Sequence, residues 1–321
     1  VRWADSAGYL AHFDAMPLGP NVVPLLPHSM LRAEVMGLQE SVSRQPTPAE
    51  LDRMEALVEK AMVEGYAGFS TDALPFHYLA NDPHRRTKIP SQWGSYGEMK
   101  RLTNVVRRHD RVWQATPPKD NTFAVFRNFL LTSGRLFGRP LKVTAVAAID
   151  LATNRSIVRL GLLLSRLLNL RLLKGQFRLQ ALPARFKIWS DGVITPIAEE
   201  IPELRRLNEC DLEDRVSRRR ILDDPDYVRA FRAMWYHGRR GWSVARLKHW
   251  LRLDDNVLSR DLSDMTIDES PVAEWQGESM QQVRNALLRW QERGEGARSS
   301  AEAEAFRSFP PQPDAADFFL H

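Results

Sequence analysis

The sequence is poor in cysteine and in long apolar runs. Cys210 is the sole cysteine among 321 residues, so no intramolecular disulfide can form and no cysteine pair can hold zinc. The longest apolar stretch, 160–173, is interrupted by Arg166, Asn169 and Arg171 and is shorter than the ~20 residues that a membrane-spanning helix needs. We therefore expect neither a disulfide-stapled secreted domain nor a membrane protein, and the localisation we expect is cytoplasmic.

Several catalytic signatures are also missing from the sequence. It contains no Gly-rich phosphate loop of the Walker type, no dinucleotide-binding fingerprint after a strand, no nucleophile elbow and no HExxH pair. Phosphoryl transfer and nicotinamide chemistry are therefore disfavoured. The first residue is Val1, with neither an initiator Met nor a signal-peptide pattern, and we expect the chain to be an internal part of a longer protein.

The overall composition is that of a folded protein with a large core. Hydrophobic residues make up 43% and charged residues 26%, which excludes wholesale disorder. The net charge of +5 raises the question of nucleic-acid binding, but the basic residues are interspersed with 40 acidic ones. The densest basic run, 215–220, is followed at once by Asp223, Asp224 and Asp226. A surface of mixed sign is the commoner meaning of such a pattern, so no nucleic-acid partner is expected.

The first 190 residues alternate short β-rich runs with amphipathic helical segments. Thr47, Pro48 and Glu50 open one helix with a capping box, and Gly65 ends it. Ser95 and Glu98 form a second predicted capping box, Phe123, Phe126 and Phe129 are expected to be the buried stripe of a third helix, and a fourth is expected at 154–174. The predicted strands are 21–26, 67–71, 111–116, 141–148 and 177–182.

These strands read as nearly continuous apolar runs, which predicts parallel βαβ units covered on both faces. An open sheet and a barrel are both compatible with this pattern. After residue 190 the rhythm changes to a polar helical stretch at 204–239, a helix near 279–293 and an expected mobile loop at 295–304. We expect one domain, with regular βα units in 1–190 and a helical or irregular insertion and extension in 191–321.

Polar residues follow the predicted strands, at the edge where ligands bind in parallel α/β folds. His28 and Asp72 are the candidate catalytic residues, and His77, Gln114 and Asp191 are the candidate substrate-binding residues. Side chains of these types can carry a proton or coordinate a cation near neutral pH, as hydrolysis requires. Each also has a structural interpretation: Asp72 as a turn former, His77 as a solvated loop residue, and His28 as a buried histidine bonded to the backbone.

One stretch resembles a known family. Pro17, Leu18, Gly19, His28, Leu31, Arg32, Val35, Met36 and Gly37, then Gly68, Phe69, Ser70 and Thr71, are similar to motifs of the N-acyl-D-amino-acid deacylases (D-aminoacylases) of the amidohydrolase superfamily. The similarity covers about the first 75 residues, and a looser βα match continues to about residue 190. It implies an α/β fold, here an incomplete (β/α)8 TIM-type barrel of central strands with a helical C-terminal extension. It also implies zinc-dependent hydrolysis of an amide (non-peptide C-N) bond in an N-acylated amino acid, a small-molecule substrate.

The sequence departs from that family at two metal-ligand positions. Pro117 and Ala145 stand near strand ends where the family has histidines, and the remaining ligands would lie before Val1 or after His321. No zinc ligand can therefore be assigned in this chain. The alternative is a barrel that has lost the metal site and serves as a ligand-binding or partner-binding module. In either case, strands cut from a barrel would leave two unpaired edges and an uncovered interior, which we expect to be apolar.

Overall fold

The computed structural model describes residues 3–321 apart from 75–76, 81, 86, 118–121, 149, 152, 155, 182–188, 191–197, 252 and 254–256. The chain divides into two compact units with separate hydrophobic cores. Unit 1 comprises Val1–Asp150 and Ser156–Lys187, and unit 2 comprises Leu151–Arg155 and Ile188–His321. The division falls close to the change of pattern predicted at residue 190. That both units belong to one domain stays a prediction.

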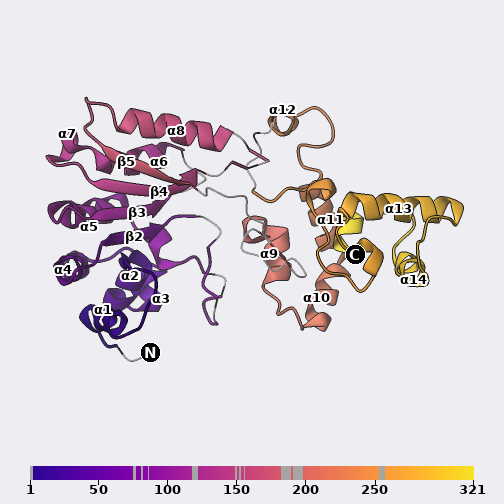
Figure 1. Cartoon of the computed structure of the whole chain (residues 1–321), viewed down its shortest axis with the longest axis horizontal. Helices are drawn as coiled ribbons and strands as arrows, with labels where there is room; N and C mark the ends of the chain where they lie inside the picture. The colour runs from indigo at the N-terminus through magenta and orange to yellow at the C-terminus, as the bar shows by residue number, and fades with distance from the viewer. Residues whose placement is uncertain are drawn as a thin grey trace. The chain divides into compact units, whose positions relative to one another are not determined.

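Unit 1 contains a five-stranded parallel sheet whose strands follow one another in sequence order, β1-β2-β3-β4-β5 (Figure 1). The strands are β1 (Leu25–Pro27), β2 (Gly68–Asp72), β3 (Val112–Thr116), β4 (Lys142–Ala148) and β5 (Gln176–Ala181). The last four confirm the predicted segments to within a residue or so, whereas β1 is shorter than the strand predicted at 21–26 and begins only at Leu25. Doubly wound sheets bind ligands where their strand order reverses. These five strands show no such reversal, so the ligand site is expected along a continuous row of strand ends.

Side chains alternate between the two faces of this sheet. Phe69, Trp113, Val143 and Phe177 are paired in register and are at most 3% exposed, because they pack against the connecting helices. The opposite face carries Ser70, Gln114, Thr144 and Arg178 in register, all partly or fully exposed. The predictions of continuous apolar strands and of an apolar uncovered face are therefore wrong, because alternate residues of each strand are polar.

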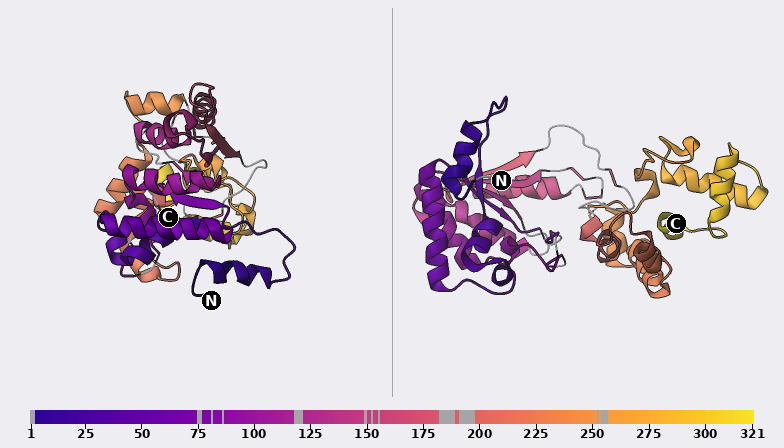
Figure 2. Two further views of the ribbon diagram at one scale, coloured as in Figure 1. Left: turned by 90° about the vertical axis from the view of Figure 1, so that its left-hand side faces the viewer. Right: turned by 90° about the horizontal axis from the view of Figure 1, so that it is seen from below.

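The helices of unit 1 connect successive strands. Helix α2 contacts β1 and β2, α5 contacts β2 and β3, and α8 contacts β4 and β5, while α4 packs against α5 (Figures 1 and 2). Their bounds are α1 Ser6–Asp14, α2 His28–Met36, α3 Leu38–Ser41, α4 Pro48–Glu64, α5 Tyr96–Arg108, α6 Thr122–Phe129, α7 Gly134–Phe137 and α8 Ser156–Leu168, with short 3-10 turns η1 Pro90–Trp93 and η2 Leu130–Thr132.

Local signals explain several of these bounds. Helix α4 has the predicted capping box between Thr47 and Glu50, and it ends at Gly65 with a φ of 114°. Helix α5 begins after Ser95, whose side chain accepts a hydrogen bond from the Glu98 amide, but the Glu98 carboxylate turns into the core instead of completing the box. In α6 the expected buried stripe is partly wrong, because Phe123 is 72% exposed and only Phe129 is fully packed.

Unit 2 is helical and encloses its own core around Phe231, Trp235, Leu287 and Phe306. The loop expected at 295–304 is wrong for its second half, because Ser299 caps α14, which begins at Ser300, and Phe306 packs inside. The elements are α9 Pro202–Asn208, α10 Arg215–Leu222, α11 Pro225–Trp235, α12 Val244–Trp250, α13 Met280–Arg293, α14 Ser300–Ser308 and α15 Ala315–Leu320, with 3-10 turns η3 Ala198–Glu200, η4 Leu262–Asp264 and η5 Ala273–Trp275. Of the helices that the structure describes, none has the length and apolar character needed to span a bilayer.

Candidate functional site

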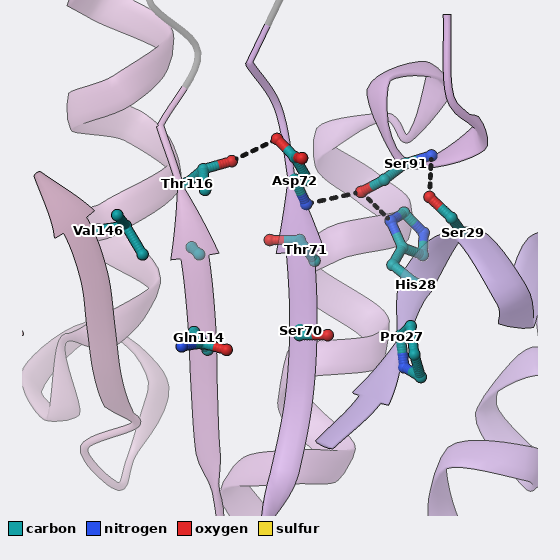
Figure 3. Close-up of a pocket in the computed structure, with 11 residues that line it drawn as sticks. Pro27, His28, Ser29, Ser70, Thr71, Asp72, Ser91, Gln114, Thr116 and Val146 are labelled. Carbon is teal, nitrogen blue, oxygen red and sulfur yellow. Dashed lines mark hydrogen bonds between the residues drawn. The ribbon is translucent and has the colours of Figure 1, made fainter. Parts of the chain in front are cut away.

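A cavity of about 270 Å³ opens at the carboxyl ends of β1 to β4, on the polar face of the sheet (Figure 3). Its position follows from parallel pairing, which brings the carboxyl ends of neighbouring strands to one edge. The lining includes three of the predicted site residues, His28, Asp72 and Gln114, together with Ser29, Ser91 and Thr116. The sequence therefore predicted the position of this cavity and part of its lining.

His28 is the first residue of α2 and is only 1% exposed. Its Nε2 lies 2.8 Å from Oε1 of Glu98, and its Nδ1 lies 3.1 Å from Oγ of Ser91. Gly94 allows this burial, since a Cβ at that position would stand 2.7 Å from Cε1 of the imidazole. The imidazole is thus buried, as the structural interpretation expected, but its two ring nitrogens bond to side chains and not to the backbone.

Glu98 joins His28 to a second buried side chain, Arg32. Nη1 of Arg32 donates to the two Glu98 oxygens at 2.8 and 2.6 Å, and its Nη2 donates to the carbonyls of Ser41 and Arg44. Burial acts to raise the pKa of Glu98, but the contacts with His28 and Arg32 outweigh burial and hold that pKa below its usual range. Glu98 is therefore an ionised acceptor, and His28 donates to it through Nε2.

Ser91 connects this buried network to the cavity. When the imidazole of His28 is neutral and carries its proton on Nε2, its Nδ1 accepts a hydrogen bond from the Ser91 hydroxyl. The same Ser91 oxygen accepts from the backbone N–H of Asp72 at 3.1 Å, and the Ser91 amide donates to Oγ of Ser29 (Figure 3). The chain of contacts from Arg32 to Asp72 thus fixes the end of β2 relative to the start of α2.

Asp72 is the carboxylate of the cavity lining. Its Oδ1 accepts from Thr116 Oγ1 at 2.7 Å and from the Leu74 amide at 2.9 Å, and its Oδ2 pairs with Nδ1 of His77. The Leu74 bond is the local turn contact that the structural interpretation expected. The bonds to Thr116 and His77 are tertiary contacts, and they place Asp72 between two strand ends and the loop that follows β2.

The pair of Asp72 and His77 is electrostatically coupled. Burial acts to raise the pKa of Asp72, yet hydrogen bonds from His77, Leu74 and Thr116 outweigh it and lower that pKa. The hydrogen bond to Asp72 raises the pKa of His77, against the opposing effect of burial. Asp72 is therefore a carboxylate at neutral pH, with a histidine beside it that holds its proton more firmly than usual.

The remaining predicted residues are distributed differently. Gln114 projects from β3 on the cavity side (Figure 3), whereas Asp191 lies outside the described residues. Ala145 is fully buried against the helices, and it is its neighbour Val146 that lines the cavity at the end of β4. At β3 the cavity side is occupied by Thr116, the residue before Pro117.

The donor set at the cavity does not fit the zinc centre that the resemblance implies. His28 uses both ring nitrogens and Asp72 uses both carboxylate oxygens in contacts within the protein, while Thr116 and Val146 offer no imidazole at β3 and β4. Across the residues with described positions, no group of three or more His, Cys, Asp or Glu could hold a metal ion.

Sequence reasoning missed Glu98 and Ser91. Glu98 was assigned to a helix cap because it stands three residues after Ser95, and nothing in the sequence indicated that it bonds to His28, which is 70 residues away. Ser91 stands in a loop segment with no motif of its own. The sequence carries one sign of this buried ion pair. Arg32 stands on the apolar side of an amphipathic helix, where an arginine needs a partner of opposite charge.

Known proteins match most of this chain in sequence and about half of it in structure. No protein-family model matches the chain. Uncharacterized proteins of Mycobacterium tuberculosis and Mycobacterium bovis are each 32% identical to it over 273 residues, which is 84% of this chain. The chain spans 42% of the length of these curated relatives.

Among solved structures, a D-aminoacylase is 22% identical and gives a TM-score of 0.42 over 57% of this chain and 35% of its own. An N-acyl-D-glutamate deacylase from Bordetella bronchiseptica, complexed with zinc and a phosphonate inhibitor, is 21% identical and gives a TM-score of 0.39 over 55% of this chain and 34% of its own. The resemblance to D-aminoacylases noted in the sequence is thus found again, as a structural similarity over 57% of the chain.

Proposed function

We propose that this chain is part of an amidohydrolase-type barrel, and that the full-length protein hydrolyses the amide C–N bond of an N-acylated amino acid. The observation that carries the proposal is the polar cavity at the carboxyl ends of parallel strands laid in sequence order. A row of parallel strands that never reverses its order is the arrangement of a (β/α)8 barrel, whose active sites lie at that edge.

The residues of the cavity have separate proposed roles. His77 does not line the cavity but pairs with Asp72 at its edge, and with its raised pKa it supplies positive charge for the substrate carboxylate. The Gln114 side chain in the cavity lining offers hydrogen bonds to the amide group. Asp72, an ionised acceptor, orients the scissile amide or the attacking water. His28 borders the cavity, but both of its ring nitrogens are engaged within the protein, so its role is to position Ser91 and the end of β2. Asp191 stays a predicted substrate-binding residue.

In this reaction a water oxygen adds to the acyl carbon, the C–N bond breaks, and the amine leaves with a proton. Because the described donors do not fit a zinc centre, any zinc ligands in the full-length protein would come from outside the described residues. We do not propose that residues at the ends of the described strands bind zinc.

A second candidate function is a binding module derived from such a barrel. The specific observation in its favour is the pair of side chains Thr116 and Val146, which occupy the cavity side of β3 and β4 and cannot replace histidine ligands. This candidate predicts binding of the acylated amino acid without turnover.

The experiment assays the full-length protein, with and without added zinc, for amine release from a panel of N-acetyl-D-amino acids. We expect hydrolysis, and we expect Asp72→Asn to lower kcat/KM at least about tenfold, which corresponds to ~1.4 kcal/mol of transition-state stabilisation. Asp14→Asn, at an exposed position on α1 outside the cavity lining, is the matched control and should retain activity. Calorimetric binding without hydrolysis would favour the binding module, and neither binding nor hydrolysis would refute both candidates.

A further inference from the structure

Helix α12 of unit 2, Val244–Trp250, exposes an unusual amount of apolar surface. Trp242 is 101% exposed, Val244 74%, Leu247 55%, Trp250 77% and Leu251 50%. No residue of the helix is fully buried. Within unit 2, Figure 1 shows α12 set apart from α11 and α13, which contribute to the unit's core. We call the exposed side chains of 242–251 the α12 surface.

The apolar side chains of the α12 surface share one side of the helix. Val244, Leu247 and Leu251 are spaced three and four residues apart, so they lie in one stripe, and Trp250 borders it. The half-buried residues Ala245 and His249 occupy the other side, by which the helix rests on its unit. The outward side of this helix is therefore the apolar one, the reverse of the usual arrangement in a globular protein.

Positive charge surrounds this apolar stripe. Residues 227–253 contain seven Arg or Lys and no Asp or Glu. Arg232 and Arg240 pair with Asp314 of α15, and Arg240 also stacks on Tyr236, so these two residues anchor the segment to the core of unit 2. Arg246 and Lys248 are exposed on α12 itself, beside the apolar stripe.

We propose that the α12 surface docks on an anionic phospholipid bilayer. A helix with an outward apolar face that includes Trp, flanked by Arg and Lys, is suited to lie in the interface plane, where the apolar side chains enter the acyl boundary and the cations meet headgroup phosphates. The lack of a long apolar run in the sequence does not argue against such docking, because a surface that lies on a bilayer needs no spanning segment.

Charge and side-chain type favour this occupant over two others. A second copy docked on the same surface would bring Arg246 and Lys248 close to their own counterparts, because the charged residues of 227–253 are all basic. A single-stranded nucleic acid would use the two tryptophans for stacking, but it would leave Val244, Leu247 and Leu251 without a partner. A bilayer accommodates both the aliphatic and the aromatic side chains.

The experiment measures co-sedimentation of the purified chain with vesicles of phosphatidylcholine alone and of phosphatidylcholine mixed with phosphatidylglycerol. We expect binding to the anionic vesicles only, weakened by high salt, because part of the attraction is electrostatic. The double variant Leu247→Ala with Trp250→Ala should bind at least about tenfold more weakly, through loss of buried apolar area. The double variant Arg246→Glu with Lys248→Glu should lose the preference for anionic vesicles.

Trp189→Ala is the matched control, because Trp189 is a 65% exposed tryptophan of unit 2 outside the α12 surface, and it should bind like the parent chain. Unchanged melting curves establish that every variant is folded. The proposal is overturned by absence of vesicle binding, by equal binding to neutral vesicles, or by equal loss in Trp189→Ala. It is also overturned if the double variant Leu247→Ala with Trp250→Ala instead abolishes a dimer or abolishes binding of a single-stranded oligonucleotide.

Discussion

The two units bury charged side chains in different ways. In unit 1, Arg32 and Glu98 are both shielded from water, and Glu98 accepts from Arg32 Nη1 and from His28, while Nε of Arg32 stays without a hydrogen-bond partner among the described residues. In unit 2, Glu302 is buried, but its partner Arg298 remains 40% exposed by side chain. An ion pair that is wholly inside the protein loses all hydration, and it persists only when its hydrogen bonds are well made. The closed network of unit 1 lies next to the cavity, which indicates a positioning role.

The units also differ in what they leave exposed. The sheet face of unit 1 is polar, with Ser70, Gln114 and Thr144 in register, whereas the α12 surface of unit 2 is apolar. Unit 1 also exposes apolar side chains away from that face, such as Leu160 and Leu163 on α8. Polar groups at strand ends suit a small ligand that forms hydrogen bonds. An apolar patch suits a large partner that removes it from water. We therefore assign the proposed hydrolysis to the cavity of unit 1 and the proposed membrane docking to the α12 surface of unit 2.

The largest expected effect tests whether the two cores are independent. Phe69→Ala and Phe231→Ala each remove a fully buried ring, from the core of unit 1 and from that of unit 2. Each should cost about 3–5 kcal/mol. In urea unfolding followed by hydrogen exchange, Phe69→Ala should lower the protection of unit 1 amides alone, and Phe231→Ala that of unit 2 amides alone. Equal loss of protection in both units from either variant would break the comparison.

The next effect compares the two buried glutamates. Glu98→Gln leaves the buried Arg32 without a counter-charge, and we expect a loss of about 3 kcal/mol, near the lower end for a broken buried pair because the amide keeps some hydrogen bonds. Glu302→Gln should cost about 1 kcal/mol, because Arg298 can turn to water. The free energy of unfolding from urea curves measures both, and a larger loss in Glu302→Gln would contradict the contrast.

The smallest effect is a difference in pH dependence. The pKa of His77 is raised by its bond to Asp72, so its stabilisation is present below the ordinary value of about 6.5 and is lost as pH rises through the raised pKa. Burial and the charge of Arg219 lower the pKa of His321 in unit 2, so its contribution is present above about 6.5 and is lost as pH falls through the lowered pKa.

As pH rises, unit 2 should therefore gain stability up to about pH 6.5, and unit 1 should lose stability above about pH 6.5. Each change should be about 1 kcal/mol or less, because His77 is partly exposed. NMR titration of the two imidazoles gives the pKa values directly, and amide exchange measures the stability of each unit. His77→Ala and His321→Ala should each abolish one of the two trends. Shifts of the same sign in both histidines would contradict this prediction.

Much of the fold could be predicted because its signals are local. Thr47 with Glu50 begins α4 and Gly65 ends it, and Ser279 caps α13, since each cap depends on a few neighbouring residues. All five strands were located from apolar runs. The runs did not show which face of the sheet is polar, because single polar residues such as Ser70 and Gln114 in a short apolar segment do not distinguish a half-exposed strand from a fully buried one.

The sequence by itself determined the order of the strands along the chain, most helix caps and the place of His28, Asp72 and Gln114 at strand ends. Tertiary structure decided what those residues do. It buried His28 between Ser91 and Glu98, turned Glu98 away from its expected cap, and joined Asp72 to His77 and Thr116. The physical reason is distance along the chain: a cap is formed within one helical turn, whereas the His28 and Glu98 contact joins residues 70 apart and exists only once the sheet has brought them together.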